Sequence, residues 1–284
     1  MTLWATLRVP PVVPLTEGDN QFALIDAAQV ERLTDKLPRD GLVLAVESLF
    51  GRPIAPAKAS ATPHLVAVAG LSAWGGVVRA LSDATESHGA LGWLVSPLSA
   101  LELAQRLRAR LDARLPDRFD CVNRYFDGRV TPHLHECLEA DQRRVFFSVC
   151  SQWWVVDHTH QWRSLSCSFA SDDAFVPPLA LDERQQAHLI DACYPYAVIE
   201  HFMQTDQELL ETVPATQRYA FFRSALQAAE QFGIDGGPSG ILFCTLALTR
   251  GPGFHQQPRW RAALDQVKAG TLTLRQAIKA EHHD

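Results

Sequence analysis

The chain has 284 residues, 47% of them hydrophobic, which supports a packed core in one large or two modest domains and excludes a disordered chain. Its 26 basic and 32 acidic residues give a net charge of −6, opposite in sign to that of a typical nucleic-acid-binding protein. The six cysteines lack Cys-x-x-Cys or disulfide spacing, and neither a signal peptide nor an apolar run of about 20 residues is present, so we expect a cytoplasmic protein without a membrane span.

The first elements alternate between strands and helices. Residues 22–25 are a short apolar strand, and Asp26 then stands where a helix over 27–37 can begin. We interpret Asp26 as the N-cap of this helix, in preference to an acid in a site. Further strands are expected at 42–46 and 64–68. The alternation predicts an α/β lobe in which helices flank a mixed sheet.

A capping box marks the next helix. Ser99 is followed three residues later by a glutamate, and apolar residues then recur at helical spacing, which predicts a helix over 99–114. Residues 121–126 alternate and include aromatic and β-branched side chains, as a half-buried strand does. Thr131 is the expected N-cap of a second helix, and a strand is expected behind it at 145–149.

A charged hexapeptide, Arg-Tyr-Phe-Asp-Gly-Arg, lies between that strand and the second helix. Its charged members are Arg124, Asp127 and Arg129. They can form one ion-pair cluster that holds strand, turn and helix together, and we favour this structural role for Asp127. A partner-facing role is the alternative for Arg129. Alternation along the strand predicts that Tyr125 and Phe126 point to opposite faces, one into the core and the other against a helix layer or a partner.

A helix, a short polar turn, this hexapeptide and a following helix together resemble the effector chaperones, or adaptors, of the bacterial type VI secretion system. Shorter matching pieces lie at 22–29, 62–66 and 89–93, so that the resemblance covers roughly residues 20–165. In that family the hexapeptide usually reads Arg-aromatic-aromatic-Asp-Pro-Arg. Gly128 therefore replaces the usual proline, which loosens the backbone of the turn and leaves the charges in place.

Two strands rich in tryptophan follow. Residues 153–157 and 161–165 flank a short loop, 158–160, and are expected to pair as an antiparallel hairpin. Trp153 and Trp154 are neighbours in the first strand, so they must point to opposite faces. Only one of them can therefore point into a given core, and the other must contact something else. We favour another layer of this protein, and the alternative is an aromatic anchor for a binding partner.

The hydrophobic period changes from two to 3.6 behind an acidic, proline-containing stretch at 170–178. We therefore expect an α/β domain over 1–172 and a smaller all-α domain over 180–284. The helices expected in this part cover 182–193, 195–203, 214–232, 238–248, 258–269 and the residues after 273. A weaker resemblance to the helical extension of many family members covers the same part.

No arrangement of residues predicts catalysis, and we expect no catalytic residue, no metal and no cofactor. His133 and His135 should splay apart on a helix, the histidines at 158 and 160 lie in a polar loop, and the pair at 282–283 lies at the chain end. The Gly-Pro-Ser-Gly sequence at 237–240 has the wrong spacing for a nucleophile elbow. A phosphate loop and a dinucleotide fingerprint are both absent from the sequence.

The resemblance implies a non-enzymatic chaperone that binds a secreted effector, a toxin, and helps load it onto the VgrG spike protein. Arg124, Tyr125, Asp127, Arg129, Trp153 and Trp154 are the candidates for structural or partner-binding roles. One alternative is an enzyme of hydrolase type whose site is assembled from dispersed His and Asp residues. The other is that the chain is itself a toxin or an immunity protein.

Overall fold

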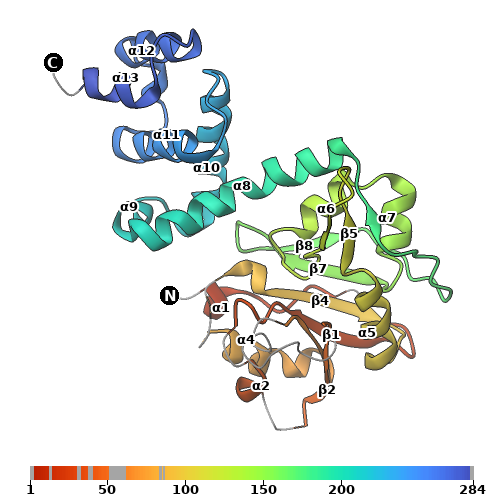
Figure 1. Cartoon of the computed structure of the whole chain (residues 1–284). Helices are drawn as coiled ribbons and strands as arrows, with labels where there is room; N and C mark the ends of the chain where they lie inside the picture. Colours follow the sequence, from red (N-terminus) through yellow and green to blue (C-terminus); the bar gives the residue numbers. More distant parts are fainter. Residues whose placement is uncertain are drawn as a thin grey trace. The chain divides into compact units, whose positions relative to one another are not determined.

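Figure 1 shows the computed structural model, which describes residues 3–12, 15–30, 33–37, 41–50, 62–82, 85 and 87–281. The chain divides into two compact units, residues 1–190 and 191–284. All strands that the structure describes lie in the first unit. Within the described residues, no helix is both long and apolar enough to cross a membrane.

A six-stranded sheet forms the centre of the first unit, in the order β2-β3-β1-β4-β7-β8, and every neighbouring pair is antiparallel (Figure 1). Its strands are β1 (Asn20–Ile25), β2 (Val43–Ser48), β3 (His64–Val68), β4 (Leu91–Ser96), β7 (Gln152–Val156) and β8 (Trp162–Leu165). The strands predicted at 22–25, 42–46 and 64–68 and the tryptophan-rich hairpin are confirmed. So is the α/β class of this part of the chain.

Helices cover both faces of this sheet. One face carries α5 (Ala100–Ala109), α6 (Thr131–Cys137) and α7 (Ala140–Phe146). The other carries α1 (Leu3–Thr6) and α4 (Trp74–Ser82). We call the core on the face with α5, α6 and α7 the first core and the core on the face with α1 and α4 the second core. In β1, Phe22 and Leu24 point into the first core, whereas Ala23 and Ile25 point into the second. Successive side chains of a strand point to opposite faces, so one apolar strand supplies two cores.

A smaller sheet, in the order β6-β5-β9, corrects two predictions. Its central strand, β5 (Asp112–Arg114), pairs antiparallel with β6 (Asp120–Val122) and parallel with β9 (Leu179–Ala180). The helix expected over 99–114 therefore ends at Ala109, although its capping box at Ser99 is confirmed. The strand expected over 121–126 ends at Val122, because its partner β5 is only three residues long.

Two further expectations in the first unit are wrong. Residues 27–30 form turns in place of the first half of the helix expected over 27–37, and α2 (Leu33–Lys36) is a single short turn. The strand expected at 145–149 is instead the end of α7 and a turn, with Phe146 and Phe147 buried in the first core. A run of apolar residues fits a buried helix end as well as a strand, and the sequence alone could not separate the two. Two 3₁₀ turns, Gly70–Ala73 and His88–Ala90, complete this unit.

A buried arginine anchors the stretch that the sequence presents as a linker. Arg110 has no exposed side-chain surface, and its guanidinium donates to the Asp173 carboxylate at 2.6 and 2.9 Å. It also donates to the carbonyl oxygens of Phe146 and Val145 and lies 4.6 Å from the ring centroid of Phe175. Residues 173–175 are thus fixed to the first unit. The two compact units meet later in the chain, between residues 190 and 191, and the expected boundary at 172–180 stays a prediction.

From Glu183 onward the described chain is helical. The helices are α8 (Glu183–Thr205), α9 (Gln207–Glu211), α10 (Ala215–Glu230), α11 (Gly237–Arg250), α12 (Pro258–Lys268) and α13 (Leu274–Glu281), with a 3₁₀ turn at Phe254–Gln256. The all-α character of this part is confirmed. Asp182 and Gln185 exchange the hydrogen bonds of a capping box at the start of α8. Pro195 does not begin a separate helix as expected, because α8 continues through it.

Candidate functional site

Two consecutive turns shape the hexapeptide, residues 124–129. The Asp127 amide donates to the Arg124 carbonyl at 2.9 Å, and the Val130 amide donates to the Asp127 carbonyl at 2.9 Å. Oδ1 of Asp127 accepts from the Arg129 amide at 2.9 Å, which is the hydrogen bond of an Asx turn. The chain therefore reverses within a few residues and brings both arginine side chains to one carboxylate.

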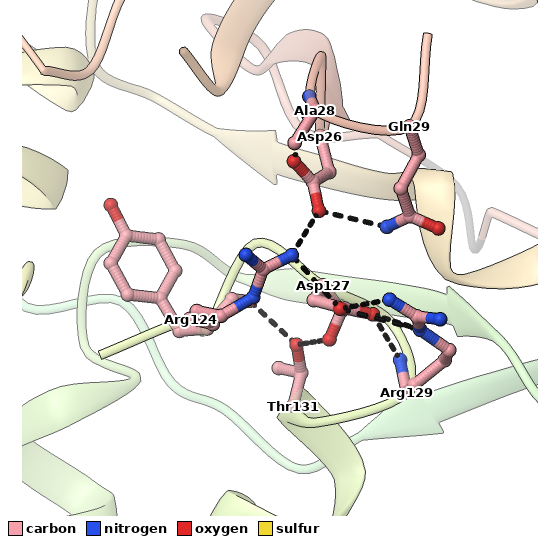
Figure 2. Close-up of polar contacts among 8 residues, drawn as sticks. Asp26, Ala28, Gln29, Arg124, Asp127, Arg129 and Thr131 are labelled. Carbon is pink, nitrogen blue, oxygen red and sulfur yellow. Dashed lines mark hydrogen bonds and ion pairs between the residues drawn. The ribbon is translucent and has the colours of Figure 1, made fainter. Parts of the chain in front are cut away.

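The Asp127 carboxylate is buried, with 2% of its side chain exposed, and it is held by both arginines (Figure 2). Arg129 donates from Nε at 3.0 Å to Oδ1 and from Nη2 at 2.8 Å to Oδ2, and Arg124 donates from Nη2 at 3.2 Å. Burial alone would raise the pKa of Asp127, but the hydrogen bonds and charge of Arg129, with the charge of Arg124, hold it below its ordinary value. Asp127 is therefore an ionised anchor at neutral pH.

Arg124 joins this carboxylate to a second one at the end of β1. Its Nη2 lies 2.7 Å from Oδ2 of Asp26, whose side chain has no exposed surface (Figure 2). Asp26 also accepts from the Ala28 amide at 3.1 Å and from Nε2 of Gln29 at 2.8 Å. Burial raises the pKa of Asp26, and the nearby charge of Asp127 adds to this, while Gln29 and Arg124 oppose it. The two aspartates thus shift in opposite directions.

We call Asp26, Arg124, Asp127 and Arg129 the arginine–aspartate cluster. It joins the end of β1 to the loop ahead of α6 with two positive and two negative charges. Arg124 keeps 43% of its side chain exposed, and its guanidinium carbon lies 5.4 Å from the ring centroid of Phe126. Because the charges satisfy one another, the cluster has the character of a rigid structural joint rather than of an acid–base pair.

A glycine in the turn before β4 makes room for this cluster. A Cβ atom on Gly89 would lie 2.6 Å from Oδ1 of Asp127 and 2.7 Å from Cγ of Arg129, closer than real Cβ contacts allow. The carbonyl of Gly89 also accepts from the Gly128 amide at 2.9 Å. A proline at 128 could not donate this hydrogen bond, so here the glycine that replaces the usual proline joins the turn to the start of β4.

The two aromatic residues of the hexapeptide are both buried in the first core, which corrects the expectation that they face opposite ways. Tyr125 donates its hydroxyl to the Leu107 carbonyl at 2.7 Å, and its ring packs edge-on against Phe126 at 5.7 Å. Alternation fails because these residues lie in a turn and not in a strand. Thr131 is the first residue of α6 rather than its N-cap, and its hydroxyl donates to the Tyr125 and Asp127 carbonyls.

The paired tryptophans point to opposite faces of the large sheet, as predicted. Trp153 is fully buried in the first core, with its ring 5.1 Å from that of Phe147. Trp154 packs partly buried against the second core and donates to Oε1 of Gln152 at 3.3 Å. The second tryptophan thus meets another layer of the same protein, the interpretation that we favoured.

The histidine pairs of the sequence do not converge on one another. Nε2 of His135 lies 2.9 Å from the Ser166 carbonyl, while His133 is directed to a glutamate on its own helix. The ring of His160 lies 5.9 Å from that of His88, and burial, with the positive charges around it, lowers the pKa of His88 to about 3. The pair at 282–283 lies outside the described residues.

Sequence reasoning missed two contacts of this site: that of Asp26 with Arg124, and that of Gly89 with the hexapeptide turn. Asp26 and Arg124 are 98 positions apart, and nothing in one sequence pairs them. Asp26 does accept the Ala28 amide, but residues 27–30 form turns and not the start of the expected helix, so the N-cap interpretation is wrong and Asp26 belongs to the cluster. One signal was available: the pieces at 22–29 and 89–93 that carry the family resemblance contain Asp26 and Gly89. Matching segments that are distant in sequence here meet at one point in space.

A protein-family model matches part of the first unit. The model described as "Domain of unknown function (DUF4123)" matches residues 21–145. The matched segment includes the whole arginine–aspartate cluster and ends within α7. Comparison with curated proteins and with solved structures gave no match.

Proposed function

We propose that this protein is a non-enzymatic adaptor that binds a type VI secretion effector, a toxin, and helps load it onto the VgrG spike protein. The observation that carries the proposal is the family match over residues 21–145, which is compatible with such a role. The resemblance of the hexapeptide, which lies inside the matched segment, to the usual adaptor sequence agrees with it. In this proposal the functional partners are proteins, and no cofactor takes part.

The geometry of the matched segment supports a role in binding rather than in turnover. An adaptor needs a surface that keeps its shape before the partner arrives, because ordering flexible side chains on binding reduces affinity. The arginine–aspartate cluster supplies such rigidity, since it fixes the end of β1, the turn before β4 and the start of α6 relative to one another. Its carboxylates are engaged by arginines and so are poorly suited to proton transfer.

A carrier that bridges toxin and spike must bind them through separate surfaces. The sheet of the first unit presents Trp154 on β7, opposite Ser164 of β8; this side chain packs against the second core but stays partly exposed. Aromatic and arginine side chains dominate the energy of protein interfaces, so Trp154 and Arg129 are the candidate contacts on this unit. Trp153 is excluded from this role because it is fully buried.

Binding to a candidate type VI effector, a toxin, tests the proposal. We expect the purified full chain to form a stable complex with that toxin in size-exclusion chromatography and to raise its soluble yield on co-expression. Trp154→Ala is the informative variant, and it should keep the wild-type circular dichroism spectrum because the side chain lies at the margin of a core. A folded wild-type chain that binds neither the toxin nor VgrG would contradict the proposal.

A further inference from the structure

A second polar cluster in the first unit belongs neither to the arginine–aspartate cluster nor to the large sheet's cores. His133 and Glu136 are three residues apart on α6, so their side chains share one face of that helix. His188, near the start of α8, faces the same carboxylate. This group could not be recognised from the sequence, because His188 is distant in the chain. The pair that the sequence spacing suggests, His133 with His135, diverges on the helix.

The three side chains lie close enough to share one ion. Nδ1 of His133 is 3.5 Å from Oε2 of Glu136, and Nε2 of His188 is 3.9 Å from the same oxygen. One ligand atom of each residue lies within 4.8 Å of the other two. Ligands of a tetrahedral zinc ion at about 2.1 Å from the metal are themselves about 3.4 Å apart. Small side-chain rotations would therefore bring all three onto one ion.

The carboxylate is oriented for this role by a further partner. Nη2 of Arg163, on β8, donates to Oε1 of Glu136 at 2.5 Å. The other carboxylate oxygen, Oε2, is the one that both imidazoles approach. A hydrogen bond to the second oxygen of a ligating carboxylate is a common feature of metal sites. The positive charge of Arg163 also repels a cation, so we expect the metal ion to bind more weakly here than at cysteine-rich structural zinc sites.

The histidines have the chemistry of metal ligands. Neutral imidazole nitrogens are among the commonest ligands of divalent transition metals in proteins. The rings of His133 and His188 are 6.4 Å apart between centroids, so neither ring stacks face-to-face on the other. Two imidazoles and one carboxylate suit divalent zinc, iron or cobalt and leave at least one position for water.

We propose that His133, Glu136 and His188 form a site for a divalent transition-metal ion of the zinc class. Bound there, the ion would link α6 to the first turns of α8 in the same unit. This function is separate from effector binding. It would stabilise the attachment of α8 to the α/β layers, because an ion that binds the folded state alone shifts the unfolding equilibrium.

Zinc titration of the untagged, metal-free full chain tests the site directly. We expect saturable binding of one Zn²⁺ per chain in calorimetry, and a visible Co²⁺ absorption spectrum of a low-coordinate N/O site. His188→Ala should weaken Zn²⁺ binding at least tenfold and abolish that spectrum. Because 42% of the His188 side chain is exposed, the variant is expected to fold, which its unfolding curve in EDTA verifies.

Two controls separate this site from other histidines. His201→Ala removes a histidine from the same helix but outside the cluster, and the double change His282→Ala/His283→Ala removes the C-terminal pair. Both should retain wild-type Zn²⁺ affinity. Glu136→Gln keeps an acceptor for Arg163 and removes the charge, and it should weaken binding like His188→Ala. Absence of saturable binding, or equal affinity of wild type, His188→Ala and Glu136→Gln, would overturn the proposal.

Discussion

Replacing Asp127 by alanine should destabilise the first unit by about 2–3 kcal/mol. The change removes a buried carboxylate and leaves Arg124 and Arg129 without the partner that both share. Breaking a buried ion pair by removing one partner typically costs about 3–5 kcal/mol. Here the value is expected below that range, because 43% of the Arg124 side chain and 24% of the Arg129 side chain are exposed and water can solvate them.

Urea unfolding followed by tryptophan fluorescence measures this loss, since Trp93 and Trp153 are buried in the first unit. Asp120→Ala is the matched control, because it removes an aspartate paired with Arg114 at 2.7 Å on an exposed surface, where solvent screens the pair and its loss should leave the unfolding curve nearly unchanged. If Asp127→Ala unfolds within about 0.5 kcal/mol of wild type, the anchoring role assigned to this carboxylate is refuted.

The same reasoning fixes the sign of the pH dependence. The pKa of Asp127 is lower in the folded protein than its ordinary value. The carboxylate of Asp127 therefore contributes fully to the free energy of unfolding at a pH above its pKa in the unfolded chain. This contribution is lost as the pH falls through its pKa in the folded protein. The difference in unfolding free energy between wild type and Asp127→Asn should be largest near pH 7 and should shrink below about pH 4. A difference that grows on acidification would contradict the charge assignment.

Three further changes test neighbouring parts of the structure. Gly89→Ala should destabilise by about 1–3 kcal/mol in urea unfolding because its methyl group overlaps the Asp127 carboxylate, whereas Gly75→Ala, with open space around it, should not. Arg110→Ala should cost about 3–5 kcal/mol, since it removes a fully buried cation and leaves its carboxylate partner unpaired; a loss below about 1 kcal/mol would contradict this. Asp26→Asn should lower the free energy of unfolding less than Asp127→Asn does at pH 7. The pKa of Asp26 is raised in the folded protein, so ionised Asp26 destabilises the folded state above that pKa, and this penalty fades as the pH falls through it. An equal or larger loss of stability for Asp26→Asn in the same assay would contradict the shift.

Local patterns in the sequence predicted the elements whose cause is local. The capping box at Ser99 and the hairpin that contains Trp153 and Trp154 both follow from residues within a few positions of one another. The sequence period likewise separated the sheet-forming part of the chain from the helical part. In each case the physical cause is a short-range hydrogen bond or the alternation of side chains.

Predictions failed where distant partners decide the outcome. Residues 112–114 continue a helical pattern but form β5, because β9 pairs with Ala113 and Arg114 from 66 positions further along the chain. Pro195 lies within α8 and did not end it, since the packing of a long helix can offset one lost hydrogen bond. The arginine–aspartate cluster depends on Asp26 meeting Arg124, which single-sequence reasoning could not pair. The sequence identified Arg124, Asp127 and Arg129 as candidates, but the fourth member of the cluster, Asp26, and the arrangement of all four required the fold.

The adaptor proposal is tested most directly by mixing the full chain with its cognate toxin and with VgrG and measuring the mass of the products by size-exclusion chromatography with light scattering. The proposal predicts a binary complex with each partner and a ternary complex when all three are present, because toxin and spike use separate surfaces. Toxin and VgrG that displace each other from the folded chain, or a chain that binds neither, would contradict it.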